Sequence, residues 1–159
     1  MGRISVAVLL GVLLTAGCAE ELPSGPPLDM RHSTRDLMAG MIDASADALW
    51  AAVGTVWDEN GENHWEPETE EQWLAVIGAA MTLVESGNLL MLGDRAVDDD
   101  QWMVHSQALV DAGAIALDAA EARDPERVFE IGEVVYNACQ NCHSIYWVGD
   151  EARGRIDSE

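Results

Sequence analysis

Lysine is absent from this chain, and basic residues are scarce throughout it. The 159 residues include 29 acidic side chains against 8 basic ones, all of them arginine, for a formal net charge of −21. Binding to nucleic-acid phosphates needs a cluster of basic residues, so nucleic-acid binding is excluded. An acidic surface attracts a basic protein partner, and it also keeps a protein hydrated at high salt. Because the acids are spread along the whole chain, both interpretations stay open.

The N-terminus lacks a hydrophobic run long enough to span a membrane. The whole sequence also contains an odd number of cysteines, three. The apolar run 4–14 has 11 residues, whereas a helix that crosses a bilayer needs about 20. Cys18, Cys139 and Cys142 are an odd set, so disulfides cannot account for all three. At least one cysteine therefore needs a role that does not depend on a disulfide.

The N-terminus has the pattern of a cleaved export signal. A basic start with Arg3 precedes the apolar run 4–14, and small residues follow before Cys18. The stretch Leu14-Thr15-Ala16-Gly17-Cys18 resembles a bacterial lipobox, with Thr15 where leucine is usual. The resemblance implies that Cys18 becomes the acylated first residue; an ordinary signal peptide with an incidental Cys18 is the alternative.

The segment after Cys18 predicts a tether. It contains three prolines and a glycine and is expected to be extended rather than helical. Ala19, next to the cysteine, resembles lipoproteins sent to the outer membrane. We therefore expect a periplasm-facing protein, anchored to the outer rather than the inner membrane. The expected organisation is a signal peptide (1–17), an acylated cysteine with a proline-rich tether (18–31), one domain (32–150) and an acidic tail (151–159).

Apolar residues recur at helical spacing from residue 33 onward, and no window alternates convincingly as a strand does. The first expected helix begins at Ser33, which has Asp36 three residues later, and runs through Val56 to a polar turn at 58–63. Three further starts are a capping box at 69–72, an acidic run at 98–101 and Asp124-Pro125. The second helix is expected to close at Gly93 and the fourth to run to Trp147. Short loops between four amphipathic segments predict an all-α fold, an antiparallel four-helix bundle.

Cys139-Gln140-Asn141-Cys142-His143 matches C-x-x-C-H, the attachment pattern of c-type haem. Residues three or four apart share a face of a helix. Cys139 and Cys142 can therefore form thioethers to two vinyl groups while His143 reaches the iron. A thioredoxin-like site would need a strand–helix–strand context, and a zinc site two more ligands nearby. A structural disulfide is a further alternative, and we expect one covalent haem c near the end of the last helix.

Four helices with C-x-x-C-H near the end of the last one resemble the cytochrome c′/cytochrome c-556 family, over residues 31–147. The resemblance implies that the first helix crosses the distal face of the haem. Some members place a methionine on the iron and transfer electrons; others leave it five-coordinate and open to NO and CO. An arginine near a haem propionate is also implied, for which Arg31 and Arg35 are the candidates.

The sixth iron ligand expected from this resemblance is Met38. Met41, one turn further, and the absence of any methionine ligand are alternatives, because methionine at helical spacing more often fills a core. His32, His64 and His105 are not expected on the iron. His105 lies on an apolar stripe and predicts a hydrogen-bonded core residue.

These patterns predict a one-electron carrier, with a haem protein that binds NO or CO as the alternative. An accessory subunit of a membrane-surface complex is a third hypothesis. The sequence contains no recognisable general base, nucleophile or substrate pocket, so an enzyme is not expected. Expected partners are a redox protein, basic if the acidic surface recognises it, and the membrane through the lipid anchor; a homodimer is a further expectation.

Overall fold

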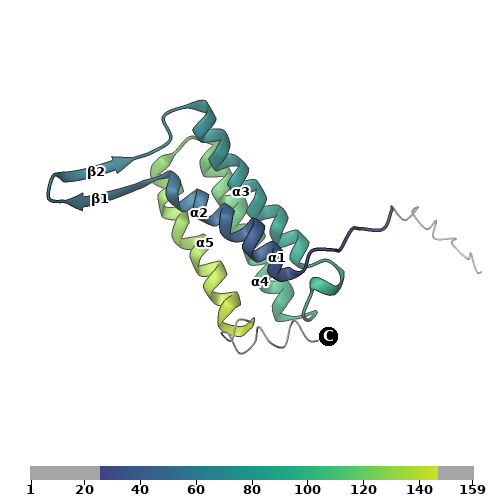
Figure 1. The fold of residues 1–159 in the computed structure, drawn as a ribbon. Coiled ribbons are helices and arrows are strands. Elements are labelled where there is room, and N and C mark those ends of the chain that lie inside the picture. The colour runs from purple at the N-terminus through teal and green to yellow at the C-terminus, as the bar shows by residue number, and fades with distance from the viewer. Residues whose placement is uncertain (1–25, 147–159) are drawn as a thin grey trace, which may run out of the picture.

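The computed structural model describes residues 26–146. The predicted signal peptide, Cys18, Trp147 and the tail 151–159 lie outside the described residues. The first helix comprises α1 (Thr34–Leu37), a π-helical segment (Met38–Ile42) and α2 (Asp43–Ala52). Three further helices follow: α3 (Glu70–Leu90), α4 (Gln101–Glu121) and α5 (Pro125–Tyr146), with a 3₁₀ turn (Gly93–Arg95) before α4 (Figure 1). The described chain is therefore mostly helical, as predicted.

The helices start where the sequence predicts. Ser33 and Asp36 form a capping box at α1, and Thr69 and Gln72 form a second one at α3. At α5, the Asp124 side chain accepts the backbone N–H of Arg127 at 3.0 Å. These side chains satisfy backbone donors that a helix start leaves unpaired.

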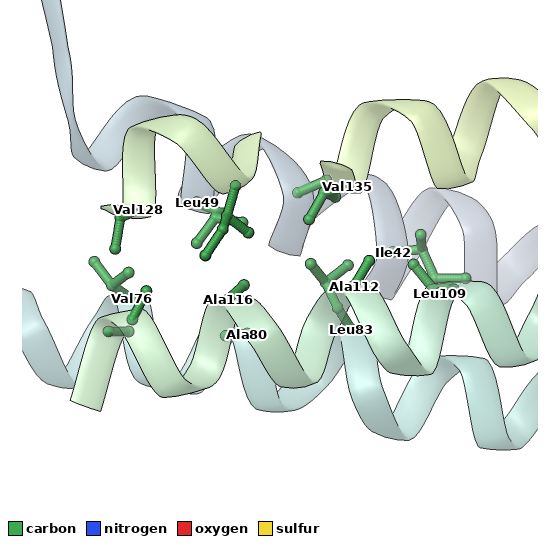
Figure 2. Close-up of a cluster of buried hydrophobic side chains, with 14 of the residues drawn as sticks. Ile42, Leu49, Val76, Ala80, Leu83, Leu109, Ala112, Ala116, Val128 and Val135 are labelled. Atoms are coloured by element: carbon green, nitrogen blue, oxygen red, sulfur yellow. The ribbon is translucent and has the colours of Figure 1, made fainter. Parts of the chain in front are cut away.

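The four helices surround one apolar core. α3 packs against α4, α4 against α5, and α2 against both α3 and α5. Leu49, Val76, Ala80, Leu83 and Val128 converge between them (Figure 2). Small residues bring α3 and α4 close together: a Cβ atom on Gly113 would lie 2.8 Å from the backbone nitrogen of Val84.

Helix α3 is long and apolar enough, by length and composition, to cross a membrane. Its buried face packs against α4 and α2 and includes Trp73, Leu83 and Leu90. In this structure it serves as a core helix.

The segment after the first helix differs from the prediction. The first helix ends at Ala52 rather than Val56, and a hairpin follows, made of β1 (Gly54–Asp58) and antiparallel β2 (Gly61–Trp65). The expectation of no strand was therefore wrong. Asn60-Gly61 is a strong hairpin signal, and Gly61 has φ +116°, a conformation that glycine adopts without strain.

The hairpin projects away from the helices (Figure 1). Its outer part is exposed, and Trp57 is 73% exposed on β1. The hairpin is attached to the helices through Trp65, whose Nε1 donates to the carbonyl of Ala51 at 3.0 Å. Its base is tight, because a Cβ on Gly54 would overlap the Trp65 ring.

Candidate haem site

The C-x-x-C-H motif continues the core-facing stripe of α5. Val128, Ile131 and Val135 are buried on this stripe. Cys139 and Cys142 lie four and seven residues beyond Val135, so they follow it on the same side of the helix. Both are half-buried free thiols, and His143 is half-buried in the last turn of α5. The motif therefore faces the bundle, and the structure pairs neither thiol in a disulfide.

The first helix runs beside this part of α5. The Trp50 Nε1 donates to the carbonyl of Gly132 at 3.0 Å, and seven residues away along each helix the charge of Asp43 acts on the Cys139 thiol. The two helices are therefore antiparallel, and seven residues along one correspond to seven residues along the other. Met41 and Met38 lie N-terminal to Asp43 in the π-helical segment, which packs against α3.

A π turn lies in the first helix where the two methionines are. The backbone N–H of Asp43 donates to the carbonyl of Met38, five residues back. This wider turn shifts the register of α1 relative to α2, so a uniform helical wheel cannot decide which methionine faces α5. Both Met38 and Met41 are partly buried against the core. Single π turns in α-helices are frequent at functional sites.

The two thiols are held in their neutral form. Burial raises the pKa of Cys139, and the negative charge of Asp43 adds to this shift. Burial likewise raises the pKa of Cys142. A catalytic thiol of the thioredoxin kind has a lowered pKa, because the thiolate is its reactive form. These cysteines have the opposite shift, and no strand–helix–strand unit surrounds them within residues 26–146.

An aromatic cluster joins the end of α5 to the start of α4. The Tyr146 hydroxyl donates to Asp98 at 2.5 Å, and its ring meets Trp102 edge-on with centroids 5.0 Å apart. The same carboxylate accepts the backbone N–H groups of Trp102 and Asp100. Burial and the hydrogen bond to Asp98 raise the pKa of Tyr146 to about 12. The end of α5 is thus fixed to α4 three residues after His143.

His105 lies beside this cluster, with its ring 6.3 Å from that of Tyr146. Its Nε2 atom is buried and has no hydrogen-bond partner in the described part of the chain. The hydrogen bond predicted for His105 as a core residue is therefore not made at Nε2 within these residues. Buried polar atoms are nearly always paired, because leaving them unpaired is costly.

The other histidines lie elsewhere. His32 is exposed before α1. His64, on the hairpin, interacts with Thr55 at 3.0 Å and with Glu66 at 3.2 Å. Over residues 26–146, no group of three or more His, Cys, Asp or Glu side chains is arranged to hold a metal ion.

Two hollows among the described residues lie away from the motif. One, of about 320 Å³, is lined by Ala48, Trp65 and Val76 at the hairpin base. The other, of about 520 Å³, lies between α2 and the first turns of α5, beside Trp50 and Phe129. Near the motif, the contacts are those of Tyr146 with Asp98 and Trp102 described above.

The arginines of the described chain differ in their burial. Arg31 is exposed and pairs with Asp29 at 2.5 Å, and Arg35 is exposed at α1. Among residues 26–146, the buried arginine is Arg95, in the turn between α3 and α4, where its Nε donates to the carbonyl of His32 at 3.1 Å. Sequence reasoning missed it; the available signal was a single base in an otherwise acidic loop.

Comparisons with models of protein families, with curated proteins and with solved structures gave no match.

Proposed function

We propose that this chain is a c-type monohaem cytochrome that transfers single electrons. The observation that supports it most is the position of Cys139, Cys142 and His143, which continue the buried stripe of α5 where the charge of Asp43 in the first helix acts on Cys139. The raised pKa values of both thiols do not fit a catalytic thiolate.

The residues present fit a covalent haem. Cys139 and Cys142 would carry the thioethers, and His143 would be one axial ligand. The buried Nε2 of His105, whose ring lies beside Tyr146, is a polar atom near this end of the fold that has no hydrogen-bond partner within residues 26–146. The haem would supply the one-electron chemistry, and the chain would tune its potential through axial ligands and burial.

Met38 is our proposed sixth ligand, with Met41 as the alternative. Both methionines lie in the π turn and are partly buried against the core, and the choice of Met38 follows the family resemblance. A thioether on the iron favours the ferrous state and raises the potential.

A second candidate function is binding of NO or CO by five-coordinate iron. It is favoured by the packing of Met38 and Met41 against the apolar core as ordinary core side chains. In that case neither sulfur would be on the iron.

Export and lipid anchoring through Cys18 remain part of the proposal, supported by the sequence pattern alone. The haem-bearing end would then face the periplasm, at the end of a tether formed by 18–31. No enzymatic activity is proposed, and a basic redox protein is the proposed partner.

Production with the c-type maturation machinery tests the proposal. Wild-type protein should carry the mass of one haem, whereas Cys139→Ser should lose at least one thioether and accumulate poorly. Ser144→Ala, an exposed change in the same helical turn, is the matched control and should mature normally. Masses that match the haem-free polypeptide for all three proteins would contradict the proposal.

A further inference from the structure

The outer half of the β1–β2 hairpin exposes apolar side chains on both of its faces. Trp57 is 73% exposed and Val56 is 47% exposed, and as neighbours in β1 they point to opposite faces. A two-stranded hairpin is only marginally stable in water when nothing packs against it. A large ring held in water on such an element is typical of a binding surface, and tryptophan is enriched where interfaces gain most of their energy.

The second tryptophan of the hairpin has a different role. Trp65 lies opposite Gly54 in the strand register, and its Nε1 donates to the carbonyl of Ala51, so it fixes the hairpin to α2. Trp57 has no such hydrogen bond within residues 26–146 and lies on the other face. The attachment of the hairpin therefore does not depend on Trp57, which is left for another contact.

The face that carries Trp57 also carries a carboxylate. Trp57 is directly opposite Glu62 in the register, and directly opposite side chains share a face of a strand pair. The interaction between Thr55 and His64, the next pair on this face, follows the same rule. Glu62 is exposed and forms no ion pair within the described part of the chain. An aromatic ring beside a carboxylate attracts a guanidinium or ammonium group.

The charge of the hairpin decides which partner can cover this face. Residues 54–68 contain five acids and no arginine. A second hairpin would bring like charges together, which is destabilising, and an anionic membrane surface would be repelled. Charge complementarity therefore favours a basic protein. In the described chain the sheet has two strands, so each strand has an unpaired outer edge, and such an edge accepts an extended segment.

We infer that the face of the hairpin formed by Trp57 and Glu62 docks an extended, basic segment of a partner protein. An arginine or lysine of that segment lies on the Trp57 ring beside Glu62. The hairpin leaves the bundle where α2 ends and α3 begins, whereas the C-x-x-C-H motif is in the last turns of α5, at the opposite end (Figure 1). The inference therefore does not depend on the haem proposal.

Isothermal titration calorimetry of the full chain with two synthetic peptides tests this inference. One peptide alternates arginine with valine, and the other alternates glutamate with valine; only the first should bind. Trp57→Val keeps a strand-forming residue but removes the ring, and should weaken binding of the arginine peptide about three- to tenfold. Glu62→Gln should weaken it about two- to fivefold, as loss of an exposed ion pair does.

Matched controls separate this face from the general attraction of a cation to an acidic chain. Phe129→Val removes another ring, 63% exposed on α5, and Glu133→Gln removes an exposed acid of the same helix. Both should bind the arginine peptide as wild type does, because charges distant from the contact are screened by salt. Far-UV circular dichroism reports whether each variant is folded, and Glu62→Gln decides if Trp57→Val loses structure.

An arginine peptide that fails to bind, or that binds Trp57→Val and Glu62→Gln as tightly as wild type, would overturn the inference. So would a wild-type dimer that Trp57→Val dissociates in sedimentation velocity, which would assign this face to a second copy. Binding to phosphatidylglycerol vesicles that is lost in Trp57→Val would assign it to a membrane and overturn the inference as well.

Discussion

At the scale of single residues, Met38 and Met41 decide between the two functions. Both are partly buried against the apolar core. Met38→Ala should convert low-spin iron to high-spin, lower the potential and admit CO rapidly, because it removes the thioether ligand. Optical spectra and stopped-flow CO binding measure these changes.

Met41→Ala is the matched control. It should leave the spectrum unchanged and cost only packing, on the order of 2 kcal/mol of unfolding free energy. Wild-type protein that is already high-spin and binds CO at once would refute Met38 ligation and favour gas binding.

Tyr146 and Asp98 give a pH-dependent prediction. The hydrogen bond from Tyr146 is the largest cause that holds the pKa of Asp98 below 3.8, followed by the backbone N–H of Trp102. A pKa lowered by folding stabilises the protein above the unfolded value, and this contribution is lost as pH falls through the folded value. Tyr146→Phe should therefore be less stable than wild type at neutral pH, and the difference should shrink below about pH 4.

Thermal unfolding at pH 7 and pH 3 measures this. Tyr136→Phe is the control, because Tyr136 is exposed and its hydroxyl has no hydrogen bond within the described residues. A Tyr146→Phe deficit that stays constant between the two pH values would show that the aromatic packing against Trp102, rather than the hydrogen bond to Asp98, carries the effect.

At the scale of helices, the contact between α3 and α4 depends on glycine. A Cβ atom on buried Gly113 would lie 2.8 Å from the backbone nitrogen of Val84, which cannot move without shifting α3. Gly113→Ala should therefore destabilise the protein by about 1–3 kcal/mol through overpacking.

Gly78→Ala is the control on α3 itself. Gly78 is exposed, and its added Cβ would meet nothing within 4 Å, so alanine should stabilise the helix by up to about 1 kcal/mol. Urea unfolding of both variants measures the two free energies. The same sign for both would contradict the close approach of α3 and α4.

The helix starts could be predicted from the sequence because they depend on local chemistry. Ser33, Thr69 and Asp124 each cap a helix through side-chain oxygens a few residues from the donors they satisfy. The core-facing position of the C-x-x-C-H motif could likewise be read from its spacing after Val135.

Other elements could not be predicted in the same way. Apolar spacing continues through Val53 and Val56 although the helix ends at Ala52, so helical periodicity concealed the hairpin. The π turn at Met38–Ile42 shifts the helical register, so no single repeat length describes the whole first helix. Arg95 is buried by elements distant in sequence, so only the folded chain reveals it.

At the scale of the whole molecule, the N-terminal pattern predicts a lipid anchor. Wild-type protein should fractionate with membranes, and Cys18→Ala should release it, because the domain would lose its acyl chains. Ultracentrifugation of cell fractions and the mass of the N-terminal peptide test this. Soluble wild-type protein without acyl groups on Cys18 would contradict the anchor and leave the haem proposal unaffected.

The most direct test of the central claim is the attachment of haem to the polypeptide. Acid–acetone extraction removes haem that is held only by axial ligands, whereas two thioethers on Cys139 and Cys142 would keep it on the chain. We expect the extracted wild-type protein to remain coloured and to carry one haem in a peptide containing both cysteines. Haem recovered free in the acetone phase, or a peptide with two unmodified thiols, would contradict the account.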